Sequence, residues 1–175
     1  IAVKTIVTTE LAAKIAADYG VRVIDVLTGF KFIGEQIHYL EEKGEESRYI
    51  FGFEESYGYL SGTYVRDKDA VNASMLICEM AAHYKLEGVS ILDALNAIYE
   101  KYGIYIHQQQ SFTCEGASGM EQMKQIMTSL RTNPPKELAG LKVTAFSDYL
   151  ASKTLDLANG GETVLGLVNA VTGGA

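Results

Sequence analysis

Hydrophobic residues follow two alternating patterns through the first third of the chain. Short runs rich in β-branched residues predict three buried strands, at residues 3–7, 21–26 and 49–53. Between these runs, apolar residues recur at helical spacing from Thr9 to Tyr19 and from Phe32 to Leu40, and each stretch is followed by a glycine, which is a common helix stop. The resulting β-α-β-α-β order predicts a parallel sheet with right-handed crossovers.

The middle of the chain is more helical. Apolar spacing predicts helices that begin after Asp67 or Asp69, at Ser90 and at Ser118, the last with a capping box completed by Glu121. Apolar and polar residues alternate over residues 104–112, which predicts a strand.

A proline pair marks a predicted domain boundary. Asn133-Pro134-Pro135 is the only proline-containing stretch, so we divide the chain into residues 1–132 and 133–175. The second part holds two short strand-like runs, at residues 141–146 and 164–167, which are too few for an independent core. We therefore expect a linker and the truncated beginning of a further domain, and the alternative is a floppy native tail.

Composition narrows the class of protein. A hydrophobic content of 47% and a charged content of 21% are typical of a soluble globular domain. The net charge of -7 gives no electrostatic reason to expect nucleic acid or an acidic membrane as a partner. No apolar run approaches the roughly 20 residues of a membrane span. No signal peptide is visible, and Cys78 and Cys114 lie in no metal or redox spacing, so we expect reduced thiols and a cytoplasmic location.

Candidate chemistry gathers in the segment Gly52-Phe53-Glu54-Glu55-Ser56-Tyr57-Gly58, directly after the third predicted strand. Open α/β sheets bind ligands at the carboxyl ends of their strands. The loop after the second strand, Leu27-Thr28-Gly29, should lie close by because parallel strands end on the same side. Carboxylates accept hydrogen bonds from sugar hydroxyls, and lysine is a common phosphate binder. The pattern favours a polyhydroxylated, phosphorylated ligand.

Simpler interpretations exist for the same residues. Glu54 and Glu55 fit a solvated acidic turn, and Asp67 and Asp69 fit helix caps. Lys68 stands at a predicted helix start, where the helix dipole disfavours a cation, so its placement favours a functional role.

Three motifs together resemble a known family. Thr28-Gly29-Phe30-Lys31, the Gly52–Gly58 segment and Val65-Arg66-Asp67-Lys68-Asp69 resemble, in order and spacing, the third domain of the α-D-phosphohexomutases. The bacterial phosphoglucomutase/phosphomannomutase type is the most similar. The resemblance covers residues 1 to about 130, and residues 131 to about 167 resemble the linker and the first part of the fourth domain. It implies a three-layer α/β/α domain with a mostly parallel, mixed sheet, followed by an incomplete α+β segment.

The resemblance also implies roles for individual residues. Glu54 and Ser56 match the pair that hydrogen-bonds sugar hydroxyls in the family. They are two apart, so in an extended loop their side chains would point the same way, whereas Glu55 would point elsewhere and have a structural role.

Residues outside this loop are implied as well. Thr28 and Gly29 match the threonine-glycine that lines the crevice, and Lys68 matches the lysine that reaches the substrate. Arg66 either supports its loop or contacts phosphate, and Lys31 is a weaker candidate of the same kind.

The implied activity belongs to a parent enzyme. Family members interconvert hexose 1-phosphate and hexose 6-phosphate through a phosphoserine and a bisphosphate intermediate, with Mg²⁺ and hexose 1,6-bisphosphate as cofactors. Glucose 1-phosphate or mannose 1-phosphate is the implied substrate, and the remaining domains of the parent chain are the implied partners.

This sequence has no Thr-Ala-Ser-His-Asn-type serine loop, no Asp-Gly-Asp-x-Asp-Arg-type metal loop and no Arg-Pro-Ser-Gly-Thr-type phosphate loop. Phosphoryl transfer depends on groups of that kind. We therefore predict that the chain alone is inactive, with no catalytic residue, no metal ligand and no cofactor of its own. The alternatives are a stand-alone sugar-phosphate-binding or interaction module, and a phosphopentomutase-like relative.

Overall fold

The computed structural model describes residues 1–108, 111–116 and 118–165. The chain divides into two compact units, Ile1–Gln109 and Gln110–Ala175, and each is described here by itself. The division between these compact units falls earlier in the chain than the predicted domain boundary after residue 132. That boundary stays a prediction.

The first unit is built on a four-stranded sheet with the order β2-β1-β3-β4. Its strands are β1 (Ala2–Thr5), β2 (Val23–Val26), β3 (Phe51–Phe53) and β4 (Tyr59–Leu60). The central strand β1 pairs in parallel with both β2 and β3, and β4 returns antiparallel to β3. The predicted mostly parallel, mixed sheet is confirmed.

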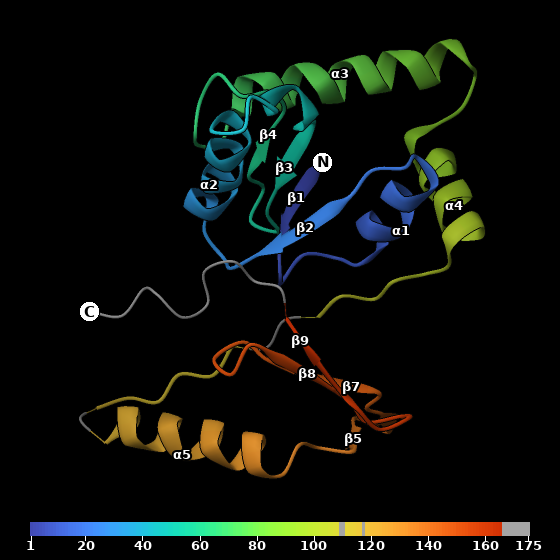
Figure 1. Cartoon of the computed structure of the whole chain (residues 1–175). Helices are drawn as coiled ribbons and strands as arrows, with labels where there is room; N and C mark the ends of the chain where they lie inside the picture. Colours follow the sequence, from blue (N-terminus) through green and yellow to red (C-terminus); the bar gives the residue numbers. More distant parts are fainter. Residues whose placement is uncertain (109–110, 117, 166–175) are drawn as a thin grey trace. The chain divides into compact units, whose positions relative to one another are not determined.

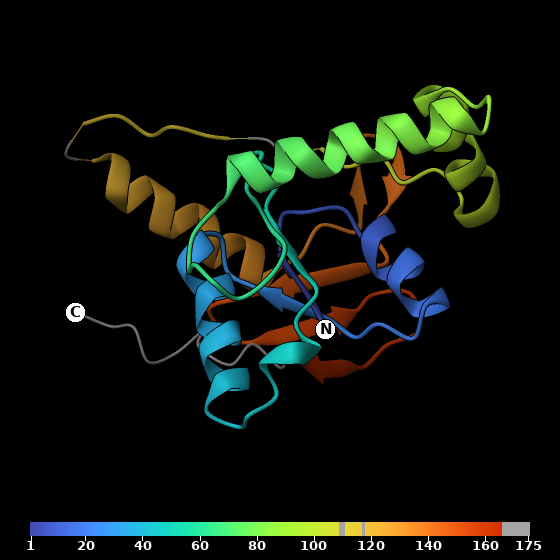
Figure 2. The same cartoon turned by 90° about the horizontal axis from the view of Figure 1, so that it is seen from above.

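Helices cover both faces of this sheet. Figures 1 and 2 show α1 (Leu11–Asp18) and α2 (Phe30–Glu41) on opposite sides. This placement follows from the strand order, because β2 and β3 flank β1 on opposite edges and both crossovers turn the same way. A short 3-10 turn, η1 (Glu46–Arg48), precedes β3, and α3 (Ala70–Leu86) and α4 (Ile91–Tyr102) follow β4.

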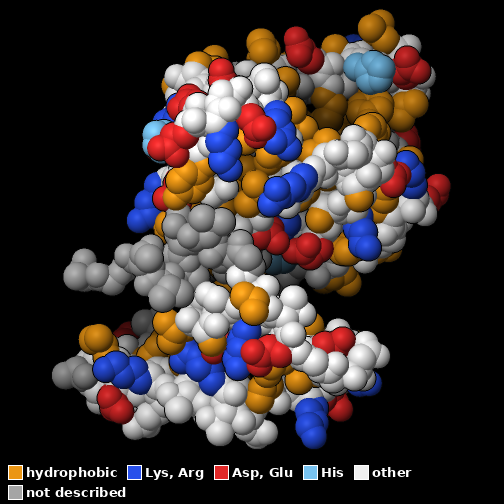
Figure 3. Space-filling model, in the orientation of Figure 1, with side chains coloured by type: hydrophobic (Ala, Val, Ile, Leu, Met, Phe, Trp, Pro, Cys, Tyr) orange, Lys and Arg blue, Asp and Glu red, His pale blue; other side chains and the backbone are white. Residues whose placement is uncertain are grey.

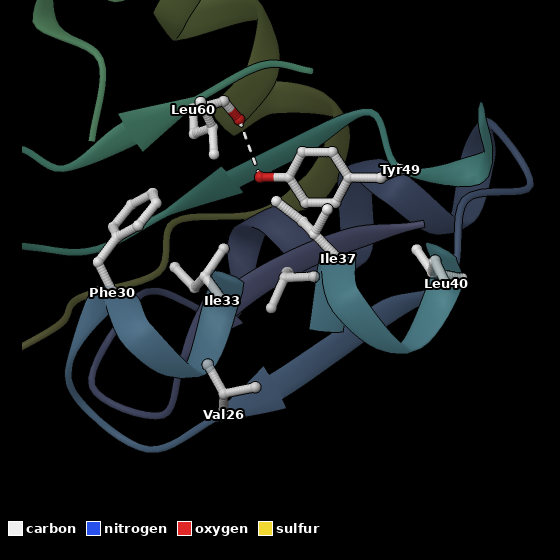
Figure 4. Close-up of a cluster of buried hydrophobic side chains, with 8 residues drawn as sticks. Val26, Phe30, Ile33, Ile37, Leu40, Tyr49 and Leu60 are labelled. Atoms are coloured by element: carbon white, nitrogen blue, oxygen red, sulfur yellow. Dashed lines mark hydrogen bonds between the residues drawn. The ribbon is translucent and has the colours of Figure 1, made fainter. Parts of the chain in front are cut away.

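The core lies between α2 and the sheet (Figure 4). Side chains of α2 fill it together with Val3, Val26 and Leu60 from three strands. Tyr49 closes one end and donates a 3.1 Å hydrogen bond from its hydroxyl to the Leu60 carbonyl oxygen. Burial raises the pKa of Tyr49, so this hydroxyl keeps its proton.

One cation is buried inside the sheet. Lys4 on β1 is fully buried, and its Nζ lies 2.8 Å from Asp25 on β2 and 2.9 Å from Glu10. It also donates to the Thr8 carbonyl oxygen at 3.2 Å. Burial alone lowers the pKa of Lys4, but hydrogen bonds and attraction from Asp25 and Glu10 outweigh it and raise the pKa above its usual value.

The ends of α3 and α4 follow the capping signals in the sequence. Asp69 caps α3 by accepting a hydrogen bond from the Asn72 N–H at 2.9 Å. Ser90 and Asp93 form a reciprocal capping box at the start of α4, and Gly103 ends that helix with a positive φ of 88°. Each of these residues satisfies backbone groups that a helix terminus leaves unpaired.

The described residues of the second unit form one helix and two small sheets. The helix is α5 (Gly119–Thr132), and β5 (Glu137–Leu138) pairs with β6 (Leu141–Lys142). The antiparallel strands β7 (Ala145–Asp148), β8 (Lys153–Asp156) and β9 (Glu162–Val164) form a meander. This unit therefore combines a helix with antiparallel strands, whereas residues 133–165, the described part of the segment predicted to be α+β, contain the strands alone.

Three predictions in this part of the chain need correction. Residues 104–108 and 111–112 are irregular rather than a strand, and residues 109–110 lie outside the described residues. Ser118 precedes α5 without a capping hydrogen bond from its side chain. The run at 141–146 is split between β6 and β7, and residues 166–167 of the other predicted strand lie outside the described residues. Alternation alone does not make a strand, because a strand also needs a partner edge.

Among the described residues, no helix is both long enough and apolar enough to cross a membrane.

Candidate functional site

Three loops meet at the carboxyl edge of the parallel strands (Figure 1). The Thr5 hydroxyl at the end of β1 donates to Glu55 Oε2 at 2.9 Å. The Gly29 N–H, after β2, donates to Glu54 Oε1 at 3.0 Å. The expected proximity of the loops after the second and third strands is therefore confirmed, and the loop after β1 joins them.

Glu54 is a buried carboxylate at a helix N-terminus. Only 5% of the residue is exposed. Its partner Gly29 is the residue that precedes α2, and the positive φ of 124° at Gly29 is one that side chains rarely allow. The N-terminal end of a helix carries partial positive charge, which stabilises a carboxylate placed there. The local fold therefore provides a reason for an acidic residue at position 54.

The loop after β3 is a tight turn. The Glu54 N–H donates to the Gly58 carbonyl oxygen at 2.9 Å, and Tyr57 takes a positive φ of 63°. Our expectation of an extended loop, with Glu54 and Ser56 pointing the same way, is wrong for this reason. Glu54 turns into the protein, whereas Ser56 and Tyr57 are exposed at the tip of the turn.

Glu55 anchors the opposite side of the turn. Its carboxylate accepts the hydrogen bond from Thr5, and the Thr5 hydroxyl also lies 2.7 Å from that of Thr8. Both threonines are buried. These contacts support the structural role predicted for Glu55.

Lys68 reaches the site from the segment before α3. Its Nζ lies 4.0 Å from Glu54 Oε2 and 3.1 Å from Asp67 Oδ1. It also stands 5.3 Å from the centre of the Phe30 ring, within the range of a cation–π contact. The side chain is 48% exposed, so it borders both solvent and the buried carboxylate.

Asp67 keeps its negative charge beside this lysine. The Lys68 backbone N–H and then the Lys68 ammonium, both bonded to Asp67, hold the pKa of the Asp67 carboxyl below its usual value. Lys68 is thus placed between two carboxylates of different exposure, one buried and one open to solvent.

Gly58 makes room for this arrangement. A Cβ at position 58 would lie 2.7 Å from Lys68 Cδ and 3.1 Å from Glu54 Oε2. The second glycine of the predicted loop motif is therefore explained by the close approach of Lys68 to Glu54.

The remaining predicted residues lie around this centre. Thr28 is exposed beside Gly29, and the ammonium of Lys31 stands 4.9 Å from the Phe32 ring centre. Arg66 is directed to α2, where its guanidinium pairs with Glu41. The structure thus brings Gly29, Glu54 and Lys68 together.

Sequence reasoning missed several residues of the site. Thr5 ends a strand on the same edge as Glu54, so the predicted topology contained the signal for it. Phe30 lies within the Thr28–Lys31 motif, but nothing in the sequence indicated that its ring would lie beside Lys68. Gly34 and Glu41 lie within α2, and nothing in the local sequence indicated that the Arg66 segment packs on them.

A separate apolar cleft of about 490 Å³ lies between α3 and the outer face of β3 and β4. Its lining includes Phe51, Tyr59, Ile77 and Met80. Figure 3 shows hydrophobic side chains at the surface below α3. None of the described residues that line the cleft is charged, so the cleft does not suit a phosphorylated sugar.

Comparison with known proteins identifies the family. The family description "Phosphoglucomutase/phosphomannomutase, alpha/beta/alpha domain III" matches residues 1–102, which is more than half of the chain. The chain belongs to this family. The predicted resemblance to the phosphohexomutase third domain is therefore confirmed.

The relatives that this chain matches are much longer than the chain itself. A phosphoglucomutase of Staphylococcus aureus (strain bovine RF122 / ET3-1) is 44% identical over 155 residues, which cover 89% of this chain and 28% of the relative. That of strain N315 is 43% identical with the same coverage. The open form of the phosphoprotein pp63/parafusin from Paramecium, a phosphoglucomutase, matches with a TM-score of 0.57 at 18% identity, covering 93% of this chain and 27% of that one. The matched part of this chain therefore corresponds to just over a quarter of the length of these relatives.

Proposed function

We propose that this chain is the hexose-recognition part of a phosphoglucomutase/phosphomannomutase. Such an enzyme would interconvert hexose 1-phosphate and hexose 6-phosphate. The family match and the phosphoglucomutase relatives support the reaction class. The observation that carries the proposal is the pairing of a buried carboxylate, Glu54, with the half-exposed ammonium of Lys68, 4.0 Å apart at the carboxyl edge of the sheet.

Glu54 would accept hydrogen bonds from sugar hydroxyls. One oxygen, Oε1, is held by the Gly29 N–H, and Oε2 faces Lys68 across a gap longer than a hydrogen bond. Oε2 would thus accept a hydroxyl proton without any change in the position of the carboxylate. Hydrogen bonds to a charged acceptor in a buried position are stronger than neutral ones.

Lys68 and the turn would complete the recognition. The Lys68 ammonium donates three hydrogen bonds and would reach a sugar oxygen or a phosphate oxygen. Ser56, exposed at the tip of the turn, and Thr28, exposed beside Gly29, would add hydroxyl groups on the solvent side. Recognition through hydroxyls would let the same residues bind the sugar in both orientations of the reaction.

The chemical step would use groups beyond these residues. We propose that the 175-residue chain alone does not catalyse phosphoryl transfer, since the serine, metal and phosphate motifs are missing from its sequence. The family implies Mg²⁺, but among the described residues no three acidic, histidine or cysteine side chains are grouped to hold a metal ion. We therefore assign Mg²⁺ and hexose 1,6-bisphosphate to the complete enzyme, and no step on this chain to the metal.

The other domains of the complete enzyme would be the partners of this chain.

Within the described residues, Cys78 and Cys114 are free thiols, which supports the proposal of a cytoplasmic enzyme.

An amide-shift NMR titration tests the proposal. Glucose 1-phosphate should shift the amides of Gly29, Glu54 to Gly58 and Lys68 in a saturable way, with a Kd on the order of 1 mM because the main phosphate site is missing. Free glucose and inorganic phosphate should bind more weakly. Glu54→Gln should weaken binding about tenfold or more, whereas Glu79→Gln, on the exposed surface of α3, should leave it unchanged. Shifts elsewhere, or none in the folded chain, would contradict the proposal.

A further inference from the structure

The segment that carries Lys68 is fastened to α2 through Arg66. The Arg66 guanidinium forms an ion pair with Glu41 near the end of α2, a residue 25 positions earlier. Its Nη1 group donates to the carbonyl oxygens of Thr63 and, at 3.2 Å, Val65. Both hydrogens of that nitrogen are therefore used inside the protein.

Gly34 allows the backbone of the same segment to approach α2 closely. A Cβ at position 34 would lie 2.8 Å from the Arg66 carbonyl oxygen and 3.3 Å from Arg66 Cβ. A backbone atom cannot swing away as the end of a side chain can. Any larger residue at position 34 would therefore move the segment off the helix.

The other end of the segment is fixed as well. The Asp69 N–H donates to the Tyr59 carbonyl oxygen at 2.9 Å, and the Asp69 carboxylate caps α3. The Tyr64 hydroxyl also donates to this carboxylate. Lys68 lies between two anchored residues, so its position depends on both anchors.

We propose that Arg66 is a positioning residue for Lys68 and does not contact the substrate, and that Gly34 and Glu41 act with it. This inference rests on the proposed function, because it assigns Lys68 to the hexose phosphate. The helix α2 then sets the geometry of the whole site. Its N-terminus holds Glu54 through Gly29, and its later turns hold the Lys68 segment through Gly34 and Glu41. Together with the Asp69 anchor, α2 thus fixes the 4.0 Å separation between Glu54 and Lys68.

The alternative role for Arg66 is direct contact with the phosphate. In that role the Arg66 guanidinium would have to leave Glu41 for the phosphate, so replacing Glu41 with Gln should not weaken binding. The two roles therefore differ in how the Arg66 and Glu41 variants compare.

The test uses the 175-residue chain, the two single ion-pair variants Arg66→Gln and Glu41→Gln, and the swap Glu41→Arg with Arg66→Glu, with Gly34→Ala as a fourth variant. The first readout needs no ligand and is the nuclear Overhauser contact between the Lys68 side chain, whose Nζ lies 5.3 Å from the centre of the Phe30 ring, and that ring. It should be present in the unmodified chain, weakened in both single variants and restored in the swap. Gly34→Ala should weaken it too, although alanine is the better helix former.

The second readout is affinity for glucose 1-phosphate. Both single variants should weaken binding by a similar factor, roughly 2- to 5-fold, and the swap should recover most of it. The inference would be overturned if Arg66→Gln and the swap lost binding while Glu41→Gln kept it and the Lys68–Phe30 contact stayed intact. Arg66 would then be a substrate ligand. A missing contact in the unmodified chain would overturn it as well. If the unmodified chain shows the contact but binds no sugar phosphate, the proposed function fails and the positioning role is judged from the contact alone.

Discussion

Replacing each of the two glycines of the Gly52–Gly58 segment with alanine should have different effects. Gly58→Ala should weaken ligand binding, and Gly52→Ala should lower the stability of the fold. Gly58→Ala places a methyl group 2.7 Å from Lys68 Cδ, which is part of a flexible, half-exposed side chain. Lys68 can swing outward, so we expect the free energy of unfolding to change by less than about 1 kcal/mol. The ammonium then leaves Glu54 and no longer reaches the ligand. A lost charged hydrogen bond to the ligand, worth roughly 1.5–3 kcal/mol, corresponds to about 10- to 150-fold weaker binding of glucose 1-phosphate.

Gly52→Ala should instead damage the core. A Cβ there would lie 2.5 Å from Ile33 Cγ2 and closer still to the Tyr49 hydroxyl, and both side chains are buried. Overpacking of this kind costs about 1–3 kcal/mol. The melting temperature should fall by about 4–8 °C for each kcal/mol in a unit of this size.

The assay combines denaturant unfolding with the amide-shift titration for each variant. The reasoning predicts that Gly58→Ala is folded but binds weakly, and that Gly52→Ala is destabilised. It would be refuted if Gly58→Ala bound glucose 1-phosphate like the unmodified chain, or if the two variants lost equal stability.

Three further predictions concern stability. Asp25→Asn combined with Glu10→Gln leaves the buried Lys4 ammonium without an anion, so the double variant should lose about 3–5 kcal/mol of unfolding free energy. Lys4→Met should lose under about 1 kcal/mol, because the two carboxylates that it leaves unpaired are 46% and 63% exposed. Equal losses by urea denaturation would argue against this asymmetry. The fold raises the pKa of Lys4, so the stabilisation by its ammonium is complete below the pKa of 10.5 in the unfolded chain and is lost as the pH rises through the higher pKa in the folded chain. The denaturant midpoint of unfolding should therefore drop above about pH 10.5, and Lys4→Met should lessen that drop. Asp69→Ala removes the cap of α3 and should cost about 1 kcal/mol, with faster hydrogen exchange in the first turn of α3; unchanged exchange there would refute the capping role.

Much of the sheet could be predicted because its signals are local. Three β-branched runs and two intervening amphipathic helices define parallel strands, and parallel strands bring their following loops to one edge. Asp69, Ser90 and Gly103 could be assigned as helix ends for the same reason, since each acts on backbone groups within a few residues.

The directions of the site side chains could not be predicted, because they depend on contacts between distant parts of the chain. Glu54 is directed inward because the Gly29 N–H, 25 residues earlier, lies at the start of α2. Arg66 turns to Glu41 for a reason of the same kind, because Gly34 allows the two segments to meet. Residues 104–108 show the converse, since their alternation is not accompanied by pairing with any strand of the described residues.

The most direct test of the central claim compares glucose 1-phosphate with glucose 6-phosphate in the same labelled chain. If Glu54 and Lys68 recognise the hexose in both orientations, the two ligands should shift the same amides, at Gly29, Glu54 to Gly58 and Lys68, and each should displace the other. Shifts at two separate sites, or no competition between the two sugars, would contradict the claim that this edge of the sheet binds both substrates of the reaction.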